Sequence, residues 1–188
     1  MPSNDAEANK DASNGCERRM SHAAITLRPA LARDSYAIAL MSRDHIEHGL
    51  GWKYDAARVR RALARSDVCA LAACDRGALV GFAIMEFGDP RAHLMLMAVR
   101  PTHRRSGIGR RLLEWLLDSA LTAGIESVHL ELREGNDAAR RFYRALSFGE
   151  TILVPRYYEG TEAALRMVRV LRSPLPAALA WQPPAHWR

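Results

Sequence analysis

The sequence predicts an α+β fold, a mixed sheet with helices on its faces, and two observations on the order of its segments support this. Two apolar runs, residues 68–74 and 78–87, are separated by Asp-Arg-Gly at 75–77, which is typical of a β-hairpin. From residue 93 onward the apolar spacing alternates between strand and helix periods, giving the order strand–helix–strand–helix–strand. A hairpin-rich first half followed by such alternation favours one sheet covered by helices.

The first half also contains an opening strand and two predicted helices. Residues 25–28 form a short strand-like run that ends at Pro29. Residues 34–44 have helical spacing, and residues 55–65 begin with Asp55, a good N-cap, and continue with strong helix formers. The stretch between these helices contains two glycines and is expected to be a loop.

The second half begins with an apolar run at residues 93–99, which Arg-Pro ends. Residues 107–123 predict a helix with a broad buried face, because apolar residues recur at helical spacing: Ile108, Leu112, Leu113, Leu116, Leu117, Ala120 and Leu121. Residues 127–133 alternate between apolar and polar side chains, as in a half-buried strand. Asn136 opens another helix, and residues 165–171 are the last strand indicated by this spacing.

The chain is expected to contain one folded domain between two irregular ends. Residues 1–22 are polar and lack periodicity, so we interpret them as a disordered leader, with Met20 as a candidate alternative start. Residues 23–172 form the domain. Residues 173–188 carry four prolines and are interpreted as a tail, whose two tryptophans suggest packing on a second copy in a homodimer.

Composition places the chain among ordinary globular proteins, because 48% of its 188 residues are hydrophobic and 26% are charged. No apolar stretch reaches the roughly 20 residues of a membrane-spanning helix, and the N-terminal stretch lacks the apolar core of a signal peptide. A cytoplasmic location without a membrane partner is therefore expected. Cys16, Cys69 and Cys74 form no CxxC pair, which argues against a disulfide framework or a zinc site.

The most informative segment is residues 97–113, in which a strand ends, a proline turn follows and a long helix begins. Backbone N–H groups at a helix start are free to bind an anion, and the helix dipole favours one there. Gly107 and Gly109 let a phosphate approach the backbone closely. Positive charge comes from the arginines around them: Arg104, Arg105 and Arg110. The pattern therefore indicates a pyrophosphate-binding site.

Other interpretations of this segment remain to be weighed. A glycine-containing turn that only enters a helix, with solvated arginines beside it, needs no ligand. A dinucleotide fingerprint requires a third glycine three residues after Gly109, where Leu112 stands. A P-loop is excluded because no G-x-x-x-x-G-K-[ST] run occurs. The net charge of +6 also allows nucleic acid as a partner, although arginines gathered in one segment fit a phosphate-rich small ligand at least as well.

Two ordered motifs carry a resemblance to the GNAT superfamily of N-acetyltransferases. V-R-P-x-x-R-R-S-G-I-G-R-x-L-L resembles the acetyl-CoA-binding motif of that family, whose core [R/Q]-x-x-G-x-[G/A] matches Arg104, Gly107 and Gly109. Downstream, L-E-L-R-E-G-N-D-A-A-R-R-F-Y-R-A-L-S-F is similar to the next motif, a strand, an Asn and a helix carrying Tyr. Ser-Phe-Gly at 147–149 departs from the commoner Leu-Gly-Phe order. The resemblance covers residues 24–171.

The resemblance implies a mostly antiparallel sheet, split between its central strands and covered by helices on both faces. It also implies that acetyl-CoA lies in the split as donor substrate and that its acetyl group passes to a primary amine by direct attack in a ternary complex. The residues implied in donor binding are Met97, Ala98, Val99, Arg104, Arg105, Ser106, Gly107, Ile108, Gly109, Arg110, Asn136 and Tyr143.

Two catalytic roles follow from the resemblance, each beside a plainer interpretation. Tyr143 matches the tyrosine that donates a proton or hydrogen bond to the departing sulfur, although its spacing also fits a core position beside Phe142 and Leu146. Glu131 matches the base of the ribosomal-protein N-terminal alanine acetyltransferases, acting through water, although it also fits a solvated face of its strand. Asn136 could contact the donor, cap its helix, or do both.

The resemblance also suggests where the acceptor binds. Arg-Tyr-Tyr at 156–158 is similar to the tyrosines after the sixth strand that line the acceptor site of those enzymes. The loop H-I-E-H-G-L-G-W-K-Y differs from their pattern and indicates a different acceptor pocket. A metal held by two of its histidines is conceivable, but a loop histidine pair is more often plain surface, so no metal is expected. The acceptor-site candidates are Glu47, His48, Trp52, Arg156, Tyr157 and Tyr158.

Three functions remain open on the sequence. The first is acetylation of a protein N-terminus or lysine, which the pattern of Glu131 and the paired tyrosines favours. The second is acetylation of a small-molecule amine, which the altered loop favours. The third is a non-catalytic acyl-CoA-binding or nucleic-acid-binding regulator, for which only the fold and the net charge of +6 speak. A nucleic-acid partner is not the expected one.

Overall fold

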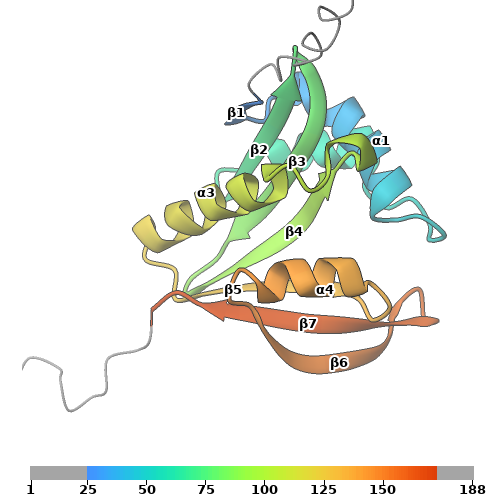
Figure 1. Cartoon of the computed structure of the whole chain (residues 1–188), viewed down its shortest axis with the longest axis vertical. Helices are drawn as coiled ribbons and strands as arrows, with labels where there is room; N and C mark the ends of the chain where they lie inside the picture. Colours follow the sequence, from blue (N-terminus) through green and yellow to red (C-terminus); the bar gives the residue numbers. More distant parts are fainter. Residues whose placement is uncertain (1–24, 173–188) are drawn as a thin grey trace, which may run out of the picture.

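The computed structural model describes residues 25–172, which form one sheet with helices on both faces (Figure 1). The predicted leader, the alternative start at Met20 and the predicted tail lie outside the described residues. The strands are β1 (Thr26–Pro29), β2 (Val68–Asp75), β3 (Ala78–Phe87), β4 (Arg91–Val99), β5 (Ser127–Arg133), β6 (Gly149–Tyr158) and β7 (Glu162–Val170). The helices are α1 (Ser35–His45), α2 (Ala56–Leu63), α3 (Ile108–Thr122) and α4 (Asp137–Arg144), with short 3-10 turns η1 (Ala32–Asp34) and η2 (Pro101–His103).

The strands are ordered β1-β2-β3-β4-β5-β7-β6, and all neighbours are antiparallel except β4 and β5. These two strands pair in parallel over three residues only, from Arg91↔Ser127 to His93↔His129. Figure 1 shows them meeting at one end and diverging toward the other. The expected split between the central strands is therefore present, and the mostly antiparallel sheet is confirmed.

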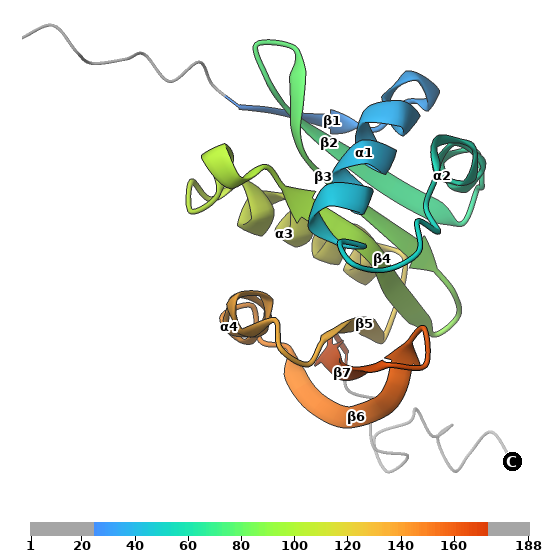
Figure 2. The ribbon, with the colours of Figure 1, turned by 90° about the vertical axis from the view of Figure 1, so that its right-hand side faces the viewer.

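The helices cover the two faces of the sheet and create two cores. On one face, α1 and α2 pack Ile38 and Val59 against Phe82. On the other face, α3 and α4 pack a larger cluster that includes Leu113 and Tyr143. Figure 2 shows α1 and α2 on the opposite side of the sheet from α3. No helix of the described range is long and apolar enough to cross a membrane.

One residue in β4 changes the direction in which its side chains point. Leu96 lies opposite Ile84, but Leu94 lies opposite Met85, so Met95 is an extra residue on β4. Such a bulge reverses the alternation of a strand. Leu94 accordingly packs with the α3 side and Leu96 with the α1 side, although residues two apart on a regular strand share a face.

The predicted elements agree with the structure except at β6 and at one helical position. The apolar spacing did not indicate β6, because Ile152 and Leu153 are adjacent and both exposed, and Pro155 follows them. β6 is also an edge strand with two register shifts, so it lacks a regular buried face. The prediction that Leu121 belongs to the buried face of α3 is wrong, because this residue lies in the last turn of the helix and is 40% exposed.

Asp34 joins β1 to α1 and gives a stability prediction. Its carboxylate accepts hydrogen bonds from both terminal nitrogens of Arg28, at 2.6 and 2.8 Å, and from the N–H of Leu31 at 2.7 Å. The hydrogen bonds from Arg28 lower the pKa of Asp34. The stabilisation is therefore complete above the unfolded-state pKa of about 3.9 and is lost as pH falls through the lower folded-state value.

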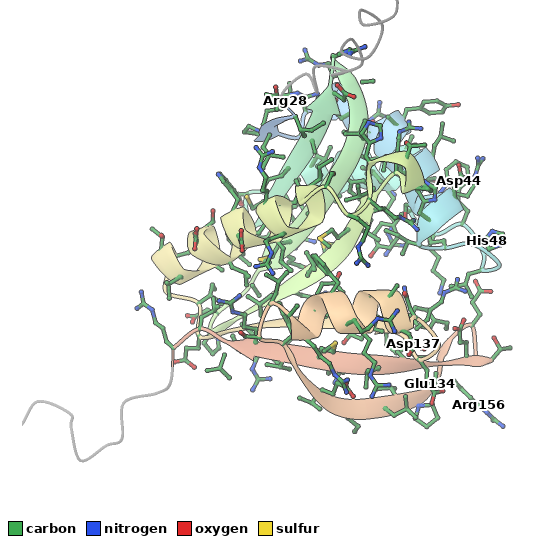
Figure 3. The ribbon with its side chains drawn as sticks, viewed as in Figure 1. Arg28, Asp44, His48, Glu134, Asp137 and Arg156 are labelled. Atoms are coloured by element: carbon green, nitrogen blue, oxygen red, sulfur yellow. The ribbon has the colours of Figure 1, made fainter. Side chains whose placement is uncertain are left out.

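We expect Asp34→Ala to lower the free energy of unfolding at pH 7 by about 2–3 kcal/mol, measured by urea denaturation. Asp44→Ala is the control, because Asp44 pairs with Arg43 on the open surface (Figure 3) and should change stability little. The difference between the two variants should shrink below about pH 4. Equal losses of unfolding free energy in the two variants at pH 7 would contradict the stabilising role given to the Asp34–Arg28 pair.

Candidate active site

A cavity of about 460 Å³ occupies the split between β4 and β5. Residues 94–97 of β4 and 130–133 of β5 form its walls. Tyr143 of α4 lines it on one side of the sheet and His48 of the loop after α1 on the other. The cavity therefore reaches from one face of the sheet to the other. In the described range, β4 is not paired with β5 beyond His93. The backbone groups on that edge of β4 therefore face the cavity.

The start of α3 has the backbone that anion binding requires. Gly107 is the N-cap with φ +82°, in the left-handed region. A Cβ at this position would meet nothing within 4 Å, so the conformation rather than the space calls for glycine. No side chain caps the helix, and the first-turn N–H groups remain open to a ligand.

Only some of the predicted donor-binding residues of β4 and of the helix start could contact the donor through their side chains. Met97 lines the cavity, whereas Ala98 is buried on the α1 side and Val99 packs on the α3 side. Ile108 is buried in the core, so its backbone is what an anion could contact. A Cβ on Gly109 would lie 3.5 Å from the Phe142 ring, an ordinary contact distance.

The polar donor-binding candidates surround the helix start on the surface. Arg104 Nε donates to the carbonyl of Val99 at 3.0 Å, which folds its side chain back over the end of β4. The Ser106 hydroxyl donates to the carbonyl of His103 at 2.6 Å and holds the turn. Arg105 is exposed with φ +64°, and Arg110 forms an exposed ion pair with Glu114. Three exposed arginines thus flank the helix start in the chain.

Tyr143 lies between two phenylalanine rings and lines the cavity. Its ring contacts Phe142 and Phe148 edge-on, with centroids 5.2 and 5.6 Å away. Its hydroxyl makes no hydrogen bond within residues 25–172. Burial raises the pKa of Tyr143 well above its usual value. The residue is therefore both part of the core and a protonated phenol facing the cavity.

Asn136 combines the two roles considered for it. Its side-chain oxygen accepts a hydrogen bond from the Ala139 N–H at 3.1 Å and caps α4. The same residue lines the cavity. Its amide group therefore remains close to any ligand that enters on the α4 side.

Glu131 faces the cavity from β5 and is held on both oxygens. His93 Nε2 lies 2.7 Å from Oε2, and Arg166 Nε donates to Oε1 at 2.8 Å. These contacts, that of His93 first, lower the pKa of Glu131. Its side chain is 10% exposed, so it is neither the solvated surface charge considered above nor a carboxylate free of partners.

On the His48 side of the cavity, contacts join the loop after α1 to β5 and to the β6–β7 hairpin. Arg133 donates to the carbonyl of His48 at 2.6 Å and pairs with Glu162 at 3.3 Å. Farther out, the Gly51 N–H donates to Glu159 at 2.7 Å. The loop after α1 is thereby fastened to the β6–β7 hairpin.

Of the tyrosine segment, only Tyr158 lines the cavity. Burial raises the pKa of Tyr158 to about 12. Tyr157 stacks edge-on against Tyr158, with centroids 5.0 Å apart, and is itself exposed. Arg156 is exposed with φ +55° and lies at the outer end of β6 (Figure 3).

The loop residues predicted to line the acceptor pocket divide in a similar way. His48 lines the cavity, together with His45 at the end of α1. Glu47 is buried, and its carboxylate accepts hydrogen bonds from the N–H groups of Lys53 and Tyr54, so it holds the loop in shape. The Trp52 indole N–H donates to a backbone carbonyl within the loop, outside the cavity lining. Across residues 25–172, no cluster of His, Cys, Asp or Glu is arranged to hold a metal ion.

Sequence patterns missed three polar residues of the site: His93, Arg133 and Arg166. Arg133 follows Glu131 by two residues and therefore shares its strand face, which was visible in the sequence. His93 and Arg166 lie on other strands, and only the pairing of β4, β5 and β7 places them beside Glu131.

Curated relatives match part of the chain. The [ribosomal protein bS18]-alanine N-acetyltransferase of Escherichia coli (strain K12) is 37% identical over 86 residues, which is 46% of this chain and 58% of that protein. The same enzyme of Salmonella typhimurium is 39% identical over 100 residues, 52% of this chain and 66% of that protein. The chain thus spans less than two thirds of the length of these relatives.

Solved structures and a family profile extend the match. The crystal structure of the ribosomal-protein-S18-alanine N-acetyltransferase of Escherichia coli superposes with a TM-score of 0.70 and 25% identity, over 84% of this chain and all of that one. The Arabidopsis thaliana NAA60 structure in complex with acetyl-CoA, at 18% identity and a TM-score of 0.70, covers 80% of this chain and all of that one and has the same fold. The profile of the acetyltransferase (GNAT) family matches residues 35–148, more than half of the chain. The chain therefore belongs to the GNAT family of acetyltransferases.

Proposed function

We propose that this chain transfers an acetyl group from acetyl-CoA to a primary amine in a ternary complex. The observation that carries the proposal is the cavity through the split sheet, with Tyr143 on one side and Glu131 at its wall. The donor enters on the α3–α4 side, with its pyrophosphate on the open N–H groups at Gly107 and the surrounding arginines. The acceptor enters from the α1 side.

In the reaction, the neutral amine attacks the thioester carbon and the C–N bond forms, the nitrogen gives one proton to Glu131 directly or through water, and the C–S bond breaks to release the thiolate. The open backbone edge of β4 supplies N–H groups for the oxyanion. The departing thiolate, with a usual pKa of about 8.5, receives a hydrogen bond from Tyr143. Because burial raises the pKa of Tyr143, the phenol keeps its proton, and it acts as a hydrogen-bond donor rather than as an acid that ionises.

The favoured acceptor is the α-amino group of a protein N-terminus. Glu131 is a weak base because its pKa is lowered, so an amine that is already partly neutral suits it best. An α-amine, with a pKa of about 7.7–8.0, is roughly a tenth neutral at pH 7, whereas lysine at about 10.4 is almost wholly charged. The relatives named as alanine N-acetyltransferases of a ribosomal protein support the same class, and with it a cytoplasmic location.

Calorimetric titration of the full chain with acetyl-CoA, with NAD as the control ligand, tests the donor. We expect micromolar binding of acetyl-CoA only. An acceptor assay then compares a peptide with a free N-terminal alanine, the same peptide Nα-acetylated but carrying a lysine, and a diamine. Transfer to the free N-terminus supports the proposal. Transfer to the diamine alone would mean that the acceptor is a small-molecule amine and not a protein N-terminus. Absence of acetyl-CoA binding would refute the proposed function.

A further inference from the structure

The surface formed by the loop after α1 and by α2 carries a group of cations without acidic partners. Lys53, Arg58, Arg60 and Arg61 are all exposed, and none of them forms an ion pair within the described part of the chain. The carboxylate that lies among them in the sequence, Asp55, caps α2 and accepts a hydrogen bond from the Arg58 N–H at 2.7 Å. Positive charge on this surface is therefore largely uncompensated.

Two aromatic rings lie beneath cations of the same surface. Arg43, in the last turn of α1, lies over the Trp52 ring, with its guanidinium carbon 5.4 Å from the ring centroid. Arg58 lies over the Tyr54 ring at 4.8 Å. The Trp52 indole N–H donates to the carbonyl of Tyr54 at 3.0 Å and joins the two stacks. Cations and rings thus form one continuous array from α1 to α2, in which Trp52 remains 43% exposed.

α2 extends this array along its outer face. Val59 and Ala62 are buried, so the side of the helix that carries Arg58 and Arg61 is turned away from the core. These two arginines are three positions apart and are therefore neighbours on the helix surface. We call the whole surface the basic strip, which consists of Arg43, Trp52, Lys53, Tyr54, Arg58, Arg60 and Arg61.

The buried carboxylate of Glu47 fixes the backbone beneath the strip. It accepts hydrogen bonds from the N–H groups of Lys53 at 2.8 Å and Tyr54 at 3.2 Å, and from the hydroxyl of Ser42 at 3.1 Å. A loop that is ordered before its partner arrives loses less conformational entropy on binding. The strip is therefore a preformed surface.

We infer that the basic strip binds a single-stranded nucleic acid. Lysine and arginine side chains neutralise phosphates and release their counterions, which drives binding. A guanidinium group that lies flat over an aromatic ring leaves its other face as a plane on which a base can stack. An acidic polypeptide would satisfy the charges but would leave these planes and the exposed indole unused. The combination of cations with rings therefore favours a nucleic acid.

The strip lies beside the candidate active site and is not part of it. His48, in the same loop, lines the cavity, whereas Trp52 lies outside the lining. Figure 2 shows α1 and α2 on the opposite side of the sheet from α3, whose start is the proposed donor site. The sequence argument against a nucleic-acid partner rested on the arginines at 104–110, and the strip is a second basic group outside that segment. Acetyl transfer does not require it.

Fluorescence anisotropy of labelled oligo(U), titrated with the full chain and saturating acetyl-CoA, tests the inference. Acetyl-CoA occupies the start of α3, the other candidate site for phosphates. We expect micromolar binding at low salt. The double variant Arg58→Gln, Arg61→Gln should bind about 10-fold more weakly. Because a single strand contributes a slope of about 0.7 in log K against log salt for each neutralised phosphate, the slope should become smaller by about 1.4.

A second variant tests stacking apart from charge. Trp52→Ala removes the exposed indole and keeps every cation of the strip, so it should weaken oligo(U) binding about 10-fold and leave the salt slope unchanged. Oligo(dT) is titrated in parallel. Binding of both strands supports the strip as a site for any single strand, and binding of oligo(U) alone supports it as a site for RNA.

The matched control for the double variant is Arg76→Gln, Arg91→Gln. It removes the same charge from two exposed arginines that lie outside the strip and form no ion pair within the described part of the chain. Its affinity for oligo(U) and its salt slope should equal those of the wild type. All variants should bind acetyl-CoA with wild-type affinity, which shows that the fold is intact.

Three results would overturn the inference. They are no binding of oligo(U) by the wild type, equal affinities in the double variant and the control, and binding of polyglutamate to the strip as tightly as oligo(U), which would make the partner an acidic protein. A chain that binds acetyl-CoA but no oligonucleotide keeps the proposed function and loses the strip. A chain that binds oligo(U) through Arg58 and Arg61 but does not bind acetyl-CoA loses only the proposed function.

Discussion

Replacing Tyr143 with Phe should lower kcat about 100-fold and leave the Kd for acetyl-CoA unchanged, because the hydroxyl acts only when the C–S bond breaks. The structure supports a selective loss: the ring stays packed between Phe142 and Phe148, and the hydroxyl has no partner in the described part of the chain. Steady-state kinetics and calorimetry measure the two quantities separately. Thermal unfolding should occur at the wild-type temperature or slightly above it, since a buried hydroxyl is removed.

The matched control for this variant is Phe148→Leu. It disturbs the same ring cluster, 5.6 Å from Tyr143, but keeps the hydroxyl. It should lower the unfolding temperature and leave kcat nearly unchanged. If Tyr143→Phe instead lowers stability and keeps turnover, Tyr143 is a core residue only, and the leaving group is stabilised by another part of the site.

Gly107→Val should weaken acetyl-CoA binding by about 10- to 100-fold, corresponding to roughly 1.4–2.8 kcal/mol. A β-branched residue is strained at φ +82°, and relief of that strain turns the first N–H groups of α3 away from the phosphates. Because a Cβ at this position meets no atom within 4 Å, steric exclusion within the protein does not contribute. Isothermal calorimetry with acetyl-CoA measures the effect.

Gly124→Val separates strain from binding. Gly124 follows the other end of α3 with φ +86° and equally open surroundings. Both variants should lose a similar stability, about 1–3 kcal/mol, but only Gly107→Val should lose affinity. Equal affinities in the two variants would mean that the start of α3 does not hold the pyrophosphate.

The sequence predicted most of the elements because their signals are local. The N-caps Asp55 and Asn136 accept hydrogen bonds from N–H groups three residues ahead, and both helices begin where these residues stand. The glycines at 107 and 109 stand at the start of a helix with a clear apolar period, so the anion site could be proposed from one short segment. The family resemblance then added the split sheet and the candidate roles of Tyr143 and Glu131.

Local signals fail where a residue depends on a distant partner. β6 is an exposed edge strand interrupted by Pro155, so it has no period to detect. Glu47 was expected at the acceptor, but the loop folds its backbone N–H groups onto that carboxylate. The bulge at Met95 is invisible in a uniformly apolar run, although it decides which side chains of β4 face which core.

The sequence by itself thus determined the helix start that we propose binds the donor, the succession of most strands along the chain and the residue types available for chemistry. The tertiary structure decided how the side chains of the candidate site are paired. His93 and Glu131 are 38 positions apart, and their 2.7 Å contact exists because β4 and β5 are in register for three residues and then separate. Capping and periodicity act over a few residues, whereas register is fixed by the packing of the whole sheet, and no single segment encodes it.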